Sequence, residues 1–104
     1  MNAPGDPQYV RSMPFTGREL MSSAAWRDLA HALNLSPREA CIVQSVFDDR
    51  SELAIAHELG ISSHTVHTHF ERLYHKLGVA SRVELVVRIV AEHLALSPLQ
   101  PTAQ

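Results

Sequence analysis

The polar residues between positions 62 and 76 are the part of this chain whose residue types and spacing could support chemistry. Four of them are histidines, namely His64, His67, His69 and His75. On a helix, steps of three and four residues return to one side, so such imidazoles could gather around a metal ion. His67 and His69 would nonetheless point to different faces, and neither a cysteine nor a convergent set of carboxylates completes a ligand set. We therefore expect no metal site.

Catalysis by these residues is not indicated either. Glu71 and His75 stand four residues apart, which on one helix is typical of a surface pair rather than a catalytic dyad. Cys41, the single cysteine, is expected to be buried beside Ile42 and Val43 and so not to act as a nucleophile. The chain also contains no glycine-rich phosphate loop and no nucleophile elbow. The sequence thus predicts a protein that is not an enzyme and uses no cofactor.

Residues 58–78 have the layout of two helices joined by a tight turn. Gly60 can adopt the left-handed conformation that a sharp helix exit needs, Ile61 supplies an apolar plug at the corner, and Ser62 can cap the next helix. A helix-turn-helix of this kind holds its second helix at a fixed angle, from which it can enter the major groove of DNA.

The outward polar residues of the second helix are the candidate DNA contacts. They are His64, Thr65, His67, Thr68, Glu71, Arg72, His75 and Lys76. We expect base-edge contacts from His67, Thr68 and Glu71, and phosphate contacts from His64, Thr65, Arg72 and Lys76. Protonation of the histidines near pH 6 would add positive charge to this surface, so binding could depend on pH. The alternative is a solvated polar face without a ligand.

The remaining sequence predicts an all-α fold that positions this helix. Apolar residues at helical spacing, bounded by serines and glycines, indicate helices at about 23–33, 36–47, 51–59, 63–77 and 81–94. Ser36 and Ser81 each precede a glutamate by three residues, which predicts two capping boxes. Trp26 is expected to anchor the first helix by packing.

Four segments are expected along the 104 residues. Residues 1–18, with several prolines and glycines, should form a flexible arm, and residues 19–34 an N-terminal helix that packs on the domain. Residues 35–96 should form the helix-turn-helix domain, and residues 97–104 a flexible tail. This length suits one small domain without a sensor domain beside it.

The last predicted helix is apolar over a wide arc. Leu85, Val86, Ile89 and Val90 lie on this arc. A small domain offers limited surface to cover such an arc, so these residues are expected to form the contact of a homodimer. The alternative is that they belong to the core.

Charge and hydropathy limit the partners and the location. The formal net charge is −2, from 9 Lys and Arg against 11 Asp and Glu, which disfavours DNA binding overall. Residues 62–90 nevertheless carry a local excess of basic residues. Neither a membrane-spanning run nor a signal pattern is present, so we expect a cytoplasmic protein associated with the nucleoid and not with a membrane.

Residues 35–90 closely resemble the LuxR-type (GerE- or FixJ-type) helix-turn-helix domain of bacterial transcriptional regulators. The matching segments are Leu35-Ser36-Pro37-Arg38-Glu39, Ile55-Ala56-His57-Glu58-Leu59-Gly60-Ile61-Ser62, Thr65-Val66, His69, Lys76-Leu77-Gly78-Val79 and Ser81-Arg82-Val83-Glu84. The resemblance implies a four-helix domain whose third helix reads the major groove of double-stranded DNA and whose fourth helix often forms a two-fold dimer contact. A separate sensor or regulator protein would then supply the signal.

The chain departs from this family at surface positions. His67 stands where the family usually has lysine, Glu71 where a basic or polar residue is common, and Glu52 and Leu53 replace a polar pair that includes a lysine. These changes weaken the expected attraction to phosphate. The alternative function is therefore a degenerate helix-turn-helix that binds another protein and has little affinity for DNA.

Overall fold

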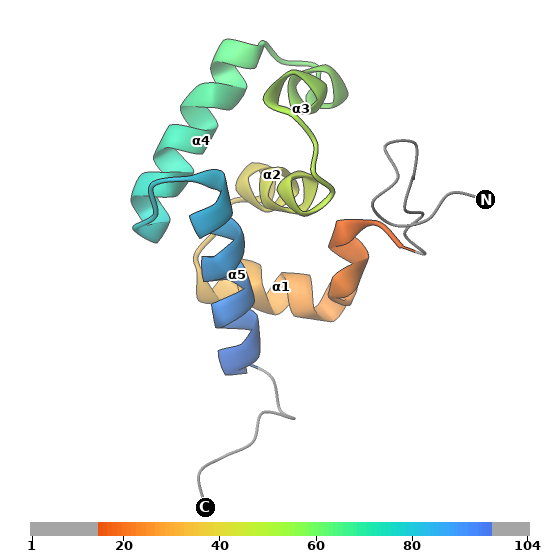
Figure 1. Cartoon of the computed structure of the whole chain (residues 1–104), viewed down its shortest axis with the longest axis vertical. Coiled ribbons are helices and arrows are strands. Elements are labelled where there is room, and N and C mark those ends of the chain that lie inside the picture. Colours follow the sequence, from red (N-terminus) through yellow and green to blue (C-terminus); the bar gives the residue numbers. More distant parts are fainter. Residues whose placement is uncertain (1–14, 97–104) are drawn as a thin grey trace, which may run out of the picture.

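The computed structural model describes residues 15–96, which form a 3-10 helix followed by five α-helices (Figure 1). The elements are η1 (Gly17–Leu20), α1 (Ser23–Ala32), α2 (Pro37–Phe47), α3 (Glu52–Leu59), α4 (Ser63–Leu77) and α5 (Arg82–Leu96). No strand occurs among the described residues, and the predicted all-α class is confirmed. The calls on residues 1–14 and 97–104 lie outside the described residues.

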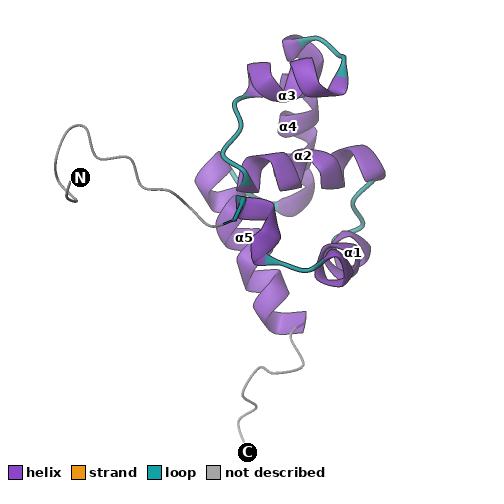
Figure 2. Ribbon diagram, turned by 90° about the vertical axis from the view of Figure 1, so that its right-hand side faces the viewer, coloured by secondary structure: helices purple, strands orange, loops and turns teal. Residues whose placement is uncertain are grey.

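Helix α2 lies at the centre of the arrangement. The α3–α4 pair lies on one side of α2 and the α1–α5 pair on the other, in both views (Figures 1 and 2). Helix α5 contacts α1, α2 and α4, so it joins the two sides. Within residues 15–96, no helix combines the length and the apolar character that crossing a bilayer requires.

Serine side chains begin most of these helices, as the sequence predicts. Ser36 and Glu39 form a complete capping box, with Ser36 N donating to Glu39 Oε1 at 2.8 Å and Glu39 N donating to Ser36 Oγ at 3.1 Å. The second predicted box differs. Glu84 N donates to Ser81 Oγ at 3.1 Å, but the Glu84 carboxylate accepts from Ala80 N at 3.2 Å rather than from Ser81. Both arrangements satisfy backbone donors that a helix start leaves free.

Two glycines end the helices of the helix-turn-helix. Gly60 and Gly78 both adopt φ of 68°, in the left-handed region that favours glycine. After Gly60, Ile61 N donates to Ala56 O at 3.0 Å, which closes the turn between α3 and α4. The predicted turn at Gly60 is therefore confirmed.

The hydrophobic core corrects the prediction of the dimer contact. Leu85 and Ile89 are completely buried within one chain, among side chains from the other helices, and Val86 is half-buried against them. Val90 is the most exposed of the predicted set, with 38% of its area exposed, and Val86 is exposed in part. Leu85 and Ile89 cannot contact a second copy, because α1, α2 and α4 already cover that side of α5.

Two further apolar positions face solvent instead of the core. Cys41, expected to be buried, is exposed on α2, because its neighbours Ile42 and Val43 take the inner side of that helix. Leu53 of α3, which stands three residues before the buried Ala56, is 73% exposed. A run of apolar residues does not identify which side of a short helix is covered.

The N-terminal helices are attached to α2 by specific contacts. Arg18 N donates to Asp48 Oδ1 at 2.7 Å, and Arg18 Nε pairs with Asp48 Oδ2 at 2.6 Å. Trp26 Nε1 donates to Arg18 O at 2.8 Å, and its ring meets Phe47 edge to face at 5.1 Å. Trp26 is thus a packing anchor, as predicted. Gly17 and Arg18, which were predicted to belong to the flexible arm, form the first half of η1.

Candidate nucleic-acid interface

Helix α4 is held to the domain by a buried inner face and presents a polar outer face. Its inner side chains are Val66, Phe70, Leu73 and Leu77. Seven of the eight predicted DNA contacts are exposed, and the eighth, Thr68, is half-buried. At about 100° per residue, the eight cover roughly half of the helix circumference, with His67 and Lys76 at opposite edges. The structure therefore brings the predicted residues onto one surface, which we call the α4 outer face.

The first turns of α4 use hydroxyl groups to stabilise the helix. Ser62 Oγ accepts from Thr65 N at 3.0 Å and lies 2.9 Å from Thr65 Oγ1. Thr68 Oγ1 donates to His64 O at 3.1 Å. Because the Thr68 proton is used inside the helix, the lone pairs of this hydroxyl remain for an external donor.

His67 lies between two carboxylates. Its Nδ1 is 3.3 Å from Glu52 Oε1 on α3, and its Nε2 is 3.5 Å from Glu71 Oε1 one turn further along α4. Glu71 was among the predicted residues, but the approach of Glu52 was not predicted. Glu52 lies 15 residues before His67, and only the packing of α3 on α4 brings the two together.

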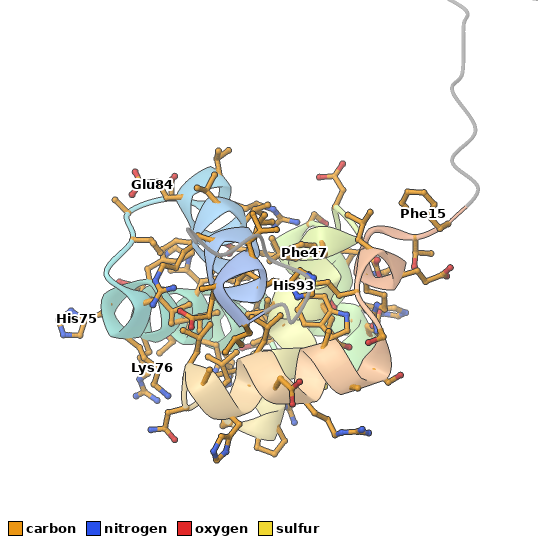
Figure 3. All side chains as sticks on the ribbon, turned by 90° about the horizontal axis from the view of Figure 1, so that it is seen from below. Phe15, Phe47, His75, Lys76, Glu84 and His93 are labelled. Carbon is orange, nitrogen blue, oxygen red and sulfur yellow. The ribbon has the colours of Figure 1, made fainter. Side chains whose placement is uncertain are left out.

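Lys76, a predicted phosphate contact, is engaged within the chain. Its Nζ pairs with Glu39 Oε1 at 2.8 Å and donates to Asn34 O at 2.9 Å, so the ammonium ties α4 to the start of α2. Figure 3 shows His75 pointing away from the body of the molecule and Lys76 extending beside it. These contacts of Lys76 join residues 37 and 42 positions apart, which local spacing does not reveal.

Glu39 titrates below its ordinary range because of the same contacts. Partial burial raises the pKa of Glu39, but hydrogen bonds from Lys76 and from the Ser36 backbone, together with the Lys76 charge, outweigh burial. They hold this pKa below its ordinary value of 4.5. A carboxyl with a depressed pKa stabilises the fold while it is ionised.

Acid is therefore expected to weaken the fold through Glu39. Its contribution is present above pH 4.5 and is lost as the pH falls through the depressed pKa of the folded state. We expect Glu39→Gln to lower the free energy of unfolding by about 1 kcal/mol at pH 7 and to flatten its decline in acid. Urea unfolding from pH 3 to pH 7 measures both effects. Glu19→Gln, at an exposed glutamate, is the control, and equal acid dependence in Glu39→Gln and the native chain would contradict the prediction.

The permanent positive charges available on the α4 outer face are few. Ion pairs engage Arg18, Arg50, Lys76 and Arg88 with carboxylates. Arg72 has no ion-pair partner in the part of the chain that the structure describes, and it is exposed on α4. The α4 outer face thus combines one free guanidinium with histidines, hydroxyls and the carboxylate of Glu71, and Glu52 of α3 lies beside it.

No group of three His, Cys, Asp or Glu side chains within residues 15–96 is placed to hold a metal ion. The histidines of α4 therefore present imidazole nitrogens for hydrogen bonding, not a ligand set. Hydrogen-bond donors and acceptors on an exposed helix are suited to contacts with base edges and phosphates.

Comparison with known proteins finds that this sequence is similar to bacterial regulators. Residues 33–89 match the family model described as bacterial regulatory proteins, luxR family. The HTH-type transcriptional regulator MalT of Vibrio cholerae is 34% identical over 86 residues, which are 83% of this chain and 7% of that protein. The probable transcriptional regulatory protein NarL of Mycobacterium tuberculosis is 40% identical over 60 residues, 58% of this chain and 28% of that protein. The chain therefore spans less than a third of the length of either relative. No solved structure gives a significant match.

Proposed function

This chain belongs to the LuxR family of bacterial regulatory proteins, and from that membership we propose that it regulates transcription by binding double-stranded DNA as a homodimer. Helix α4 enters the major groove, which is about 12 Å wide and admits a helix of about 10–12 Å diameter. The observation that carries the proposal is the α4 outer face, which is exposed and polar along the whole helix while the inner face is buried.

Individual residues of α4 have distinct roles in this proposal. His67, Thr68 and Glu71 contact base edges, while His64, Thr65 and Arg72 lie toward the phosphates. His75 is exposed near the C-terminal end of α4 and lies beside the DNA backbone in this proposal. Lys76 supports the interface by holding α4 on α2, since its ammonium binds Glu39 and Asn34.

The homodimer forms through an exposed apolar stripe on α5. The stripe consists of Val83, Val87, Val90 and Leu94, whose exposed fractions are 73%, 61%, 38% and 56%. Their spacing of four, three and four residues places them on one side of α5. A two-fold contact there buries all four residues of both copies and sets the two α4 helices about one DNA turn, roughly 34 Å, apart.

The setting of this activity is part of the same proposal. The protein acts in the cytoplasm, associated with the nucleoid, and a separate sensor or regulator protein supplies its signal. Both statements are supported by the family membership, and co-purification with nucleoid DNA from the native host tests the location.

Salt dependence tests the proposed DNA binding. We expect affinity for a duplex to fall steeply with salt, and Arg72→Ala to reduce the slope of log affinity against log salt by about 1. Arg27→Ala is the matched control, because Arg27 is an exposed arginine on α1, across α2 from α4 (Figures 1 and 2). Fluorescence anisotropy with a random-sequence duplex at low salt measures these slopes. Equal slopes for Arg72→Ala and the native chain would remove Arg72 from the interface.

A second candidate function is a protein-docking module that keeps the fold and has lost its affinity for DNA. The engagement of Lys76 within the chain and the carboxylates of Glu52 and Glu71 on or beside α4 favour it. Such a module forms no DNA complex even at low salt. The same anisotropy titration therefore separates the two functions.

A further inference from the structure

We propose that Glu52 is a positioning residue that sets the base preference of α4, by fixing His67 so that Glu71 reads a cytosine. This inference rests on the proposed binding to DNA. It assigns a role to Glu52, which lies on α3 outside the α4 outer face, and it names the base that the interface selects.

The first step concerns the protons of His67. A carboxylate only accepts hydrogen bonds, whereas a neutral imidazole donates from one ring nitrogen and accepts at the other. The two carboxylates near His67 therefore cannot both be hydrogen-bonded to a neutral ring. Only the doubly protonated ring could donate to both at once.

Glu52 is the stronger partner in this competition. Its Oε1 lies 3.3 Å from Nδ1, whereas Glu71 Oε1 lies 3.5 Å from Nε2. The Glu52 side chain is 41% exposed and that of Glu71 is 67% exposed, so water competes less for Glu52. The neutral ring accordingly carries its proton on Nδ1 and donates it to Glu52, and the Nε2 lone pair faces outward.

The second step concerns Glu71. With a lone pair on Nε2, His67 repels the nearby Glu71 oxygen instead of binding it. The mainly exposed Glu71 carboxylate then remains free to accept from a base, and His67 Nε2 adds a second acceptor beside it. Glu71 and His67 Nε2 then form a pair of hydrogen-bond acceptors on α4.

An acceptor pair selects a base that presents an amino group in the major groove. Cytosine offers its N4 amino group and is the usual partner of a glutamate, whereas adenine places the acceptor N7 beside its N6 amino group and guanine offers only the acceptors N7 and O6. Guanine opposite Glu71 would place its acceptors N7 and O6 against the acceptors of Glu71 and His67, which opposes binding. The chain inverts the preference that a lysine at these positions would have, since lysine binds the guanine acceptors.

The surroundings of His67 agree with this assignment. On α4, the charged or titratable neighbours one turn away are His64 and Glu71, and from α3 the neighbour is Glu52. Burial raises the pKa of Tyr74, the Arg82 charge lowers this pKa, and the Glu52 charge raises it. Tyr74 therefore lies close enough to Glu52 for the Glu52 charge to act on it.

Selection of binding sites from a duplex pool randomised over one half-site, at low salt and pH 8, tests the base preference. We expect the native chain to prefer cytosine over guanine about tenfold at one position. Glu71→Gln should shift that preference to adenine, because a glutamine amide pairs with adenine N6 and N7. Glu52→Gln should reduce the preference to about threefold or less while DNA binding persists.

The ring nitrogens of His67 give a second readout that needs no DNA. Nitrogen-15 chemical shifts of the free protein at pH 8 report which ring nitrogen carries the proton. We expect the Nδ1–H form in the native chain and a shift toward the Nε2–H form in Glu52→Gln. The matched control is Glu58→Gln, since Glu58 is also on α3 and its side chain is 42% exposed, and it should change neither readout.

Each outcome decides between the claims. Salt-sensitive DNA binding without a cytosine preference, or a cytosine preference that survives in Glu71→Gln, overturns this inference and leaves the proposed function intact. An unchanged His67 tautomer in Glu52→Gln removes the role of Glu52. Absence of any DNA complex overturns the proposed function and the base preference with it.

Discussion

Replacing Val87 with aspartate is expected to make the protein monomeric and to weaken its binding to a duplex with two half-sites by about 100-fold. Val87 lies in the middle of the apolar stripe on α5, with Val83 and Val90 beside it. In the proposed dimer, aspartate at this position would be a buried carboxylate without a partner, which opposes association. The single chain should fold normally, because Val87 is exposed within it.

The loss of affinity follows from the geometry of two-site binding. A dimer that holds both α4 helices on one duplex binds its second half-site at a high effective concentration, and a monomer loses this gain. Binding of Val87→Asp to a duplex with a single half-site should therefore equal that of the native chain. Sedimentation equilibrium measures the oligomeric state, and anisotropy with one-site and two-site duplexes measures the affinities.

Leu20→Asp provides a matched control for this substitution. Leu20 is 62% exposed and Val87 is 61% exposed, so both changes place a carboxylate at an exposed apolar position. Leu20 lies on η1, away from the stripe. A native protein that sediments as a monomer at high concentration, or equal dimerisation of Val87→Asp, would contradict the assignment of the stripe.

Local signals predicted the helices well because each signal acts within four residues. The serine before each helix from α1 to α5 accepts from a backbone N–H three residues later, and Gly60 and Gly78 adopt the conformation that ends a helix. These contacts depend on neighbouring residues alone. The positions of helix ends could therefore be predicted from the sequence.

Which side of each helix packs against the other helices could not be predicted in the same way. Periodicity indicated that α5 has a wide apolar arc, but not which part of the arc the other helices cover. Leu85 and Ile89 turned out to be core, and Val83, Val87 and Leu94 are exposed. Which neighbour packs on a helix depends on the whole fold, and a sequence window does not contain that information.

In the candidate interface, too, local geometry could be predicted and contacts between helices could not. All eight predicted residues lie on the α4 outer face, since helical geometry alone places them there. The contact between Lys76 and Glu39 and the contact between His67 and Glu52 were not predicted, because the two glutamates lie on other helices. These two contacts change the chemistry that the α4 outer face offers, by removing a cation and orienting an imidazole.

The electrostatic attraction of α4 to DNA is weak, so the proposed affinity for DNA must depend more on the fit of α4 to the groove and on dimerisation. Phosphate contacts by lysine and arginine supply most nonspecific affinity, and α4 offers one free guanidinium among the described residues. Dimerisation compensates by joining two weak half-site contacts into one stronger complex. In the proposed complex, the α5 stripe would supply affinity and the acceptors on α4 would supply specificity to the same interface.

Replacing Gly17 with alanine is expected to detach η1 from α2 and to lower the free energy of unfolding by about 3 kcal/mol. A Cβ atom at Gly17 would overlap the backbone carbonyl of Phe47. The atoms of this carbonyl are backbone atoms of the last residue of α2, so they cannot rotate aside as a flexible side chain could. The segment at Gly17 must move instead, and it carries the Arg18 contacts with it.

The cost of this movement comes from polar groups that lose their partners. Asp48 would lose both bonds from Arg18, at 2.7 Å and 2.6 Å, and Trp26 Nε1 would lose its acceptor, Arg18 O. Charge-assisted hydrogen bonds contribute about 1.5–3 kcal/mol each, less where water replaces the partner. Because Trp26 is the single tryptophan, its fluorescence reports the change directly, and we expect emission at longer wavelength in Gly17→Ala.

Thr16→Ala is the control for Gly17→Ala, since it removes side-chain atoms from the exposed neighbouring residue and should change stability by less than about 0.5 kcal/mol. Arg18→Ala should act in the same direction as Gly17→Ala but less strongly, because the backbone donor to Asp48 is kept. Urea unfolding followed by Trp26 fluorescence distinguishes all three. Native stability and native emission in Gly17→Ala would mean that η1 does not dock on α2 in solution, and the contacts of Arg18 and Trp26 would then not contribute to holding the N-terminal helices on the domain.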